Sequence, residues 1–194
     1  MKRLGITGGI GSGKSTVSRL LRQSGIPVYD SDSEAKRLMH TLLRQPIEQL
    51  FGSQAYEDEN LNRKYIASQV FCNPELLNRL NAIVHPAVGE DFERWAEEQS
   101  DEVPFVALES AILFESGFDS RVDVTLLVDA PIEERIRRTV LRDGSSPDEV
   151  RARIAHQNTE LAQTKADYVI HNHTESALAE QVNSLYINLK QLWK

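Results

Sequence analysis

The stretch that decides the fold is residues 8–15, Gly8-Gly9-Ile10-Gly11-Ser12-Gly13-Lys14-Ser15. It fits the pattern G-x-x-x-x-G-K-[ST], and apolar residues stand directly before it. In this pattern a strand leads into a loop whose backbone N–H groups point at phosphate oxygens, and a helix then begins at the lysine. The alternative is a glycine-rich turn beside a lysine, with a structural role only. The strand before the loop and the helix after it favour a site for a nucleoside triphosphate.

Each part of this loop has an expected role. The lysine of the pattern reaches the β- and γ-phosphates, and its serine hydroxyl coordinates Mg²⁺. Lys14 is therefore a candidate catalytic residue and Ser15 a candidate metal ligand. The residues expected to contact the nucleotide here are Gly9, Ile10, Gly11, Ser12, Gly13, Lys14, Ser15 and Thr16.

Composition narrows the class of protein. The 194 residues are 40% hydrophobic and 26% charged, as in a globular protein with one sizeable core. A net charge of −7 opposes broad binding to nucleic acid or anionic membranes. The single cysteine, Cys72, excludes an internal disulfide, and its apolar neighbours predict a buried thiol. No apolar run suits a membrane span or a signal peptide, so we expect a cytoplasmic protein.

Strands and helices alternate along most of the chain. Strands are predicted at 4–7, 26–29, 103–108, 122–128 and 168–170, with helices between them, which indicates a parallel sheet with right-handed crossovers. No strand is predicted from 46 to 99, where His85-Pro86 is expected to break a helix. We therefore predict an α/β, three-layer P-loop NTPase fold. Its core comprises 1–32, 100–134 and 158–194, with a helical insert at 33–99 and a helical lid at 135–157.

Two carboxylates follow the second predicted strand, in the run Asp30-Ser31-Asp32. Carboxyl ends of parallel strands meet at one edge of a sheet, so both should lie near the phosphate loop. Phosphoryl transfer uses one carboxylate to deprotonate the acceptor hydroxyl and often another near Mg²⁺. Helix capping by Asp32 beside a solvated Asp30 explains the residues equally well. The guanine-specific patterns Asp-x-x-Gly and Asn-Lys-x-Asp do not occur in the chain, which opposes a signalling GTPase.

Arginines crowd the two helices on either side of the turn at 143–147. Such a hairpin could close over bound nucleotide and place guanidinium groups on phosphate oxygens. The alternative is a solvated face with pairs such as Glu134 and Arg138. Arg138 and Arg142, one turn apart, are the two expected to reach phosphate. The full set is Arg135, Arg137, Arg138, Arg142, Arg151 and Arg153.

Other candidates are weaker. Glu109 follows the third long strand, where a second acid near Mg²⁺ is expected, whereas solvation explains Glu115. His171 and His173 form a poor zinc site without further ligands at suitable spacing. His85 could be structural at a helix junction or contact a ligand.

Taken together, the motifs resemble the dephospho-coenzyme A kinase family over nearly the whole chain. The extended form Thr-Gly-Gly-Ile-Gly-Ser-Gly-Lys at 7–14 is more specific than the bare phosphate-loop pattern. Residues 28–32 are similar to the family's Val-Ile-Asp-Ala-Asp, and 80–86 follow its Leu-Asn…His-Pro signature. The lid pattern is carried by Arg138, Arg142-Asp143-Gly144, Arg153 and Gln157, and the closing strand by residues 166–172.

The resemblance implies a reaction and residue roles. ATP, with Mg²⁺, would phosphorylate the 3′-hydroxyl of the ribose of dephospho-coenzyme A, the last step of coenzyme A biosynthesis. Asp32 would be the general base, with Asp30 beside it at the acceptor. Lys14 and the lid arginines Arg138 and Arg142 would stabilise the transferred group.

The resemblance also implies contacts outside the phosphate loop and shows one departure. Asn172 would face the adenine of ATP, and the insert would receive the acceptor, with Arg63 and His85 as candidate contacts. The family has Asp-x-Pro-Leu-Leu-Phe-Glu where residues 109–115 read Glu-Ser-Ala-Ile-Leu-Phe-Glu. The acid survives as Glu109 and the proline is lost, which leaves the role of Glu109 open.

Two alternatives stay open at this point. One is a related small-molecule or nucleoside monophosphate kinase with a different insert. The other is an ATP-binding regulatory module without turnover, which Asp30 and Asp32 oppose because a pure binder needs no base beside the γ-phosphate. The sequence indicates neither a nucleic-acid nor a membrane partner, and it does not indicate an oligomeric state.

Overall fold

The computed structural model describes residues 1–155, 157, 159–173 and 175–193. His156, within the predicted lid, lies outside the described residues. The chain forms two compact units, one of residues Met1–Asp30 with Ala96–Lys194 and the other of residues Ser31–Trp95. The predicted insert, 33–99, overlaps the second unit.

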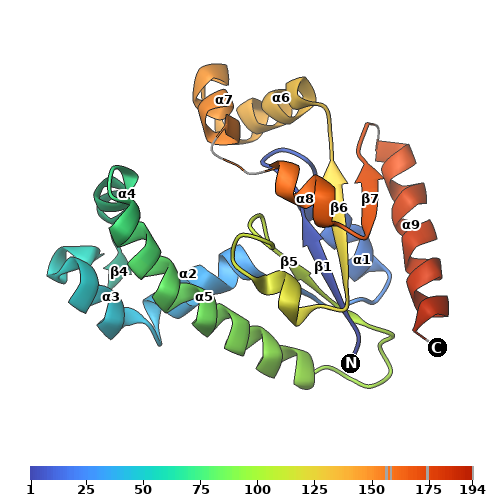
Figure 1. Ribbon diagram of the computed structural model, residues 1–194, viewed down its shortest axis with the longest axis horizontal. Coiled ribbons are helices and arrows are strands. Elements are labelled where there is room, and N and C mark those ends of the chain that lie inside the picture. The colour runs from blue at the N-terminus through green and yellow to red at the C-terminus, as the bar shows by residue number, and fades with distance from the viewer. Residues whose placement is uncertain (156, 158, 174, 194) are drawn as a thin grey trace. The chain divides into compact units, whose positions relative to one another are not determined.

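A parallel sheet of five strands is the centre of the first unit. The strands are β1 (Arg3–Thr7), β2 (Val28–Asp30), β5 (Val106–Glu109), β6 (Val124–Asp129) and β7 (Tyr168–His171). Their order is β2-β5-β1-β6-β7, and each neighbouring pair is parallel, which confirms the predicted α/β sheet. β1 is the middle strand, so the phosphate loop that follows it leaves the sheet at its centre (Figure 1).

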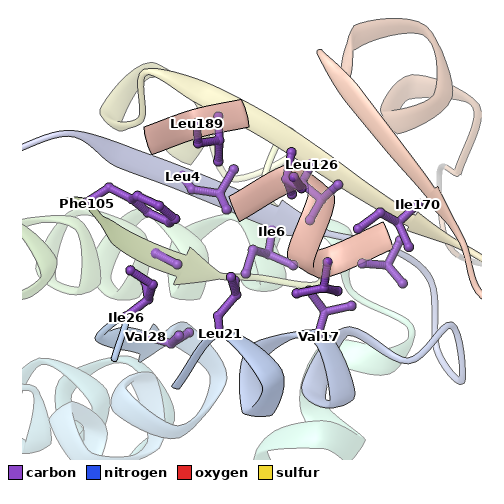
Figure 2. Packing of buried hydrophobic residues seen from close by; sticks show 14 of the residues in the cluster. Leu4, Ile6, Val17, Leu21, Ile26, Val28, Phe105, Leu126, Ile170 and Leu189 are labelled. Carbon is purple, nitrogen blue, oxygen red and sulfur yellow. The ribbon is translucent and has the colours of Figure 1, made fainter. Parts of the chain in front are cut away.

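The core of this unit lies between the sheet and two helices, α1 (Lys14–Gln23) and α9 (Glu175–Leu192). Figure 2 shows side chains from both helices converging on those of the strands, among them Val17, Leu21 and Leu189 against Leu4 and Ile6. All five are fully buried. Burying a side chain of this size stabilises the fold by about 1.5–3 kcal/mol, so this layer anchors the helix that begins at the phosphate loop.

The first unit has shorter elements as well. They are η2 (Phe118–Arg121), α6 (Ile132–Asp143), α7 (Pro147–Ala155) and α8 (Thr159–Lys165). The two helices predicted on either side of the turn at 143–147 correspond to α6 and α7, whereas α8 was not predicted. Figure 1 places α6 and α7 beyond the carboxyl end of β6.

The second unit is mostly helical. Its helices are α2 (Ser31–His40), α3 (Arg44–Phe51), η1 (Ser53–Ala55), α4 (Arg63–Phe71) and most of α5 (Pro74–Glu97). The prediction of no strand here is wrong, because β3 (Tyr56–Glu57) pairs antiparallel with β4 (Asn60–Leu61). The turn between them has φ of 49° at Asp58 and 82° at Glu59. Two left-handed residues form a tight hairpin turn, which sequences usually signal with Asn-Gly or Asp-Gly rather than Asp-Glu.

Two further expectations in this unit are wrong. α5 runs unbroken through Pro86. A proline removes one backbone hydrogen bond, but Val84, Val88 and Phe92 recur every fourth residue and are all buried, so packing of one face holds the helix together. Cys72 is exposed rather than buried. It ends α4 beside Phe71, whose side chain is 83% exposed. Among the described residues, no helix is both long and apolar enough to cross a membrane.

Candidate functional site

The phosphate loop connects β1 to α1 and is shaped by its glycines. Gly13 has φ of 103°, in the left-handed region that residues with a side chain rarely adopt. A Cβ atom there would lie 2.1 Å from Nδ2 of Asn172. Glycine at this position therefore permits the turn, as the pattern predicts, and also the close approach of the Asn172 side chain.

Lys14 folds back over the loop. Its Nζ donates hydrogen bonds to the carbonyl oxygen of Gly8 at 2.6 Å and to that of Gly9 at 3.4 Å. Since α1 begins at Lys14, the ammonium group lies at the positive end of the helix dipole. The loop thus concentrates positive charge where the pattern places the phosphates of a nucleotide.

A hydroxyl and two carboxylates gather at the same edge of the sheet. Ser15 Oγ donates a hydrogen bond to Oε1 of Glu109 at 3.3 Å, although the two residues are 94 positions apart. Glu109 ends β5 and is in register with Asp30, the last residue of β2. The structure therefore places Glu109 and Asp30 at the ends of adjacent strands, as expected, and Ser15, in the first turn of α1, beside Glu109.

This donor set fits Mg²⁺. Mg²⁺ prefers oxygen ligands, keeps several waters and is often held by one or two carboxylates together with substrate phosphates. Ser15 and Glu109 supply a hydroxyl and a carboxylate beside the loop. In the part of the chain that the structure describes, no cluster of three or more His, Cys, Asp or Glu side chains could hold a metal by itself.

A cavity of 630 Å³ lies between the phosphate loop, α6 and the start of α9. This volume is within the range of small-molecule sites. The residues that line it are Gly13, Thr16, Glu134, Arg137, Arg138, Leu141, Arg142, Asn172, His173 and Leu178. Thr16, Arg138, Arg142 and Asn172, all predicted to contact nucleotide, therefore share one cavity.

Arg138, on the lid, has a guanidinium nitrogen that is buried and not hydrogen-bonded among the described residues. Glu134 is held by Arg137 through two hydrogen bonds, and not by Arg138 as in the alternative of a solvated, paired face. Arg138 Nη2 instead donates to the carbonyl oxygen of Asn172 at 3.2 Å. Its Nη1 is buried and has no hydrogen-bond partner among the described residues. A buried donor without a partner is costly, and a phosphate oxygen would satisfy it.

Arg142 is held at the tip of the lid. It pairs with Asp143 at 2.6 Å, and Arg153 contacts the same carboxylate at 3.3 Å. The hydrogen bonds from Arg142, then from Arg153, lower the pKa of Asp143 to about 2. Arg153 therefore serves the lid itself in this structure, whereas Arg142 also lines the cavity.

The side chain of Asn172 is hydrogen-bonded to the phosphate loop. Its side chain is buried, and Nδ2 donates to the carbonyl oxygen of Ser12 at 2.8 Å. Its backbone N–H donates to the carbonyl oxygen of Asp129 at 2.7 Å. The contact with adenine stays a prediction. The neighbouring rings of His171 and His173 stack with centroids 5.9 Å apart. Nδ1 of His171 lies 3.7 Å from Oδ2 of Asp129.

Arg135, which the sequence left between a phosphate contact and a solvated residue, is not solvated. It is buried, and its Nε donates to the carbonyl oxygen of Ile10 at 2.9 Å. Burial lowers the pKa of its guanidinium. A Cβ on Gly9 would lie 2.0 Å from its Nη2, so a side chain at that position would displace the guanidinium. The sequence offered one signal of this burial. Arg135 and Thr139 are four residues apart, so they lie on the same face of α6 as the apolar residue Ile136.

A second cavity, of 440 Å³, lies within the Ser31–Trp95 unit. Asp32, Lys36 and Arg63 supply its charges. Its apolar lining comprises Ala35, Met39, Leu61, Ile66, Ala67 and Leu80. Asp32 lies in the first turn of α2, which begins at Ser31, so it is not the residue before the helix as the capping alternative required.

The structure brings two of the three predicted acceptor residues of this unit to one cavity. Asp32 and Arg63 line it, and His85 does not. His85 lies on α5, where burial lowers the pKa of its imidazole. Lys36, one turn after Asp32, was missed by sequence reasoning, although i, i+4 spacing on a helix was a usable signal.

Comparison with known proteins relates the chain to one enzyme family. The family model of dephospho-CoA kinase matches residues 3–177. The dephospho-CoA kinase of Porphyromonas gingivalis is 46% identical over 186 residues, which cover 94% of this chain and 91% of that protein. A protein from Thermus thermophilus with a known crystal structure is 39% identical in sequence to this chain. The two structures superpose with a TM-score of 0.87, and the match covers 96% of each chain. Shikimate kinase from Bacteroides thetaiotaomicron shares the fold, at 18% identity and a TM-score of 0.55 over 97% of this chain and 98% of that one.

Proposed function

The chain belongs to the dephospho-CoA kinase family, and on this premise we propose how its residues phosphorylate dephospho-CoA in the last step of coenzyme A biosynthesis. The reaction is transfer of the γ-phosphoryl group of ATP to the 3′-hydroxyl of the ribose, giving coenzyme A and ADP. The observation that carries most weight is the extent of the family match. It includes the phosphate loop and the cavity lined by Asp32 and Arg63.

ATP binds with its phosphates on the loop at 8–15 and its nucleoside in the 630 Å³ cavity. The orientation of Lys14 supports this, because its ammonium group already lies against the loop carbonyls and needs little movement to reach phosphate oxygens. Arg138 and Arg142 neutralise charge on the phosphates from the lid. A fixed cation at the transferred group stabilises the transition state more than the ground state, since it needs no reorganisation.

Mg²⁺ is held by the Ser15 hydroxyl, with Glu109 and Asp30 as further oxygen donors. When bound, the ion neutralises charge on the phosphates of ATP. In this arrangement Glu109 supplies the same carboxylate chemistry as the aspartate that the family has at its position. The loss of the proline two residues later does not remove the acid from the strand end.

Asp32 acts as the general base. The 3′-oxygen of the acceptor attacks the γ-phosphorus, the bond to the β–γ bridging oxygen breaks and ADP leaves, and the hydroxyl proton passes to the Asp32 carboxylate. The cavity around Asp32 supports this role, because it combines an apolar floor with the cations Lys36 and Arg63. An acceptor with an adenine, a pantetheine arm and a diphosphate calls for both kinds of surface.

Arg138 gives a test of the nucleotide site. Replacing it by methionine should lower kcat/KM for ATP about tenfold, with a fall in kcat, because a charge-assisted contact with phosphate is lost that is stronger in the transition state. Arg137→Met is the matched control, since Arg137 lines the same cavity but is held by Glu134. Steady-state kinetics at saturating acceptor measure both. Equal effects of the two substitutions would contradict the role given to Arg138.

A small-molecule kinase with another acceptor is the second candidate, and the likeness to shikimate kinase is one of fold alone. ADP release should be measured with ATP, Mg²⁺ and, in separate reactions, dephospho-CoA, shikimate, nucleoside monophosphates and small alcohols. We expect turnover with dephospho-CoA only. Turnover with a different acceptor would reject dephospho-CoA as the acceptor, and ATP binding without any turnover would favour a regulatory module.

Small-molecule substrates and a net charge of −7 also support a cytoplasmic enzyme without nucleic-acid or membrane partners.

A further inference from the structure

Ile10, in the middle of the phosphate loop, is attached to the lid in three ways. Its side chain packs against an apolar cluster within the lid, formed by Ile136, Val150 and Ile154. Its carbonyl oxygen accepts a hydrogen bond from Arg135 Nε at 2.9 Å. Its N–H donates to the side-chain oxygen of Gln157 at 2.8 Å. The loop is thus joined to the lid through both backbone groups and the side chain of one residue.

Gln157 closes this arrangement, which we call the Ile10 clasp (Ile10, Arg135 and Gln157). The oxygen that accepts from Ile10 N–H also accepts from Nη2 of Arg135 at 3.2 Å. An amide oxygen has two lone pairs, so one side chain can hold two donors. Arg135 comes from the first turn of α6, and Gln157 follows the end of α7. Both ends of the helical hairpin therefore meet at the same loop residue.

The clasp constrains more than Ile10. A Cβ on Gly9 would lie 2.0 Å from Arg135 Nη2, and one on Gly11 would lie 2.3 Å from the Arg135 carbonyl oxygen. The loop on both sides of Ile10 is therefore in close contact with α6. Because Arg135 is buried, Gln157 has a second effect, which is to limit the freedom of the guanidinium that holds the loop carbonyl.

We infer that Gln157 is a positioning residue that holds the phosphate loop in its nucleotide-binding shape from the base of the lid. It needs no contact with substrate, since it acts on the loop through Ile10 and Arg135. The inference rests on the proposed function only in that ATP is the ligand of the loop. It follows that loop and lid order together, and that loss of the side-chain oxygen weakens ATP binding while leaving acceptor binding intact.

Gln157→Met tests the clasp, because methionine has similar length and lacks a strong acceptor. Gln163→Met is the matched control, since Gln163 lies exposed on α8. We expect Gln157→Met to raise the Kd and the KM for ATP about tenfold, as for loss of a hydrogen bond to a buried donor. The KM for dephospho-CoA should stay at the wild-type value. Hydrogen exchange of the peptide that contains Ile10 should accelerate in the free protein.

Each outcome bears on the inference. A merely structural role would reduce the active fraction, which lowers the apparent kcat and leaves both KM values unchanged; that result, or ATP binding equal to that of Gln163→Met, would overturn it. If Gln157→Met does not fold, Gln157→Asn, which withdraws the oxygen by one methylene, should show the same selective change. ATP binding and hydrogen exchange are measured without an acceptor. Absence of turnover of dephospho-CoA by the wild-type protein would therefore reject the proposed function, whereas these two measurements would still test the Ile10 clasp.

Discussion

Replacing Lys14 by methionine should lower the kcat for ADP release about a thousandfold, the upper range for removing one preorganised group that stabilises transition-state charge. Methionine keeps the length and the apolar stem of the side chain and removes the ammonium group. In the structure that group is within 2.6 Å of the Gly8 carbonyl oxygen, at the start of α1. The loss should exceed the weakening of ATP binding, because charge on the transferring group develops in the transition state.

Two measurements make this test decisive. Thermal unfolding should show an unchanged transition for Lys14→Met, because Lys14 contacts loop carbonyls and contributes no side chain to the buried core. Lys190→Met is the matched control, since Lys190 is exposed on α9 and lies 5.2 Å from the ring of Tyr186. A Lys14→Met protein that keeps a tenth or more of the wild-type kcat would contradict the assigned role.

The second large effect is expected from Asp32→Asn. The substitution keeps the shape of the side chain and removes the proton acceptor, so kcat should fall about a thousandfold, within the range of general base catalysis. The Kd for ATP should not change, because in the proposed mechanism Asp32 contacts the acceptor hydroxyl, whereas the residues proposed to bind ATP are those of the phosphate loop and the lid. ADP release and equilibrium binding of ATP, measured on the same preparation, separate the two quantities.

The matched control for this prediction is Asp101→Asn, which changes an exposed aspartate outside both cavities. Wild-type kcat in Asp32→Asn would remove the general base from the proposal. A loss confined to the KM for dephospho-CoA would instead assign Asp32 to acceptor binding. Only a selective loss of kcat supports proton transfer.

Several features of the site could be predicted because they depend on residues close together in the chain. The phosphate loop needs glycine where φ is positive, and Gly8, Gly11 and Gly13 have such values. The alternation of apolar strands with amphipathic helices predicted the parallel sheet. The position of Asp30 at a strand end followed from that alternation alone.

Local patterns failed where packing decided. A proline usually ends a helix, yet α5 continues through Pro86 because Val84, Val88 and Phe92 bury one face. An apolar run suggested a buried Cys72, yet the run ends a helix at an exposed position. Pairing of Glu134 with Arg138 was as good by spacing as pairing with Arg137. The fold favours Arg137, which leaves Arg138 to contact Asn172.

Local patterns in the chain were sufficient to predict the ligand class, the sheet and the family, because glycine conformations, strand periodicity and motif spacing act over a few residues. Which distant side chains meet depends on the packing of the whole fold. Ser15 and Glu109 are 94 residues apart, and Ile10 and Gln157 are 147 apart. Hydrogen bonds require atoms within about 3 Å, and no local pattern encodes such a distance between separate elements. The order of the strands and the packing of the lid bring these atoms together.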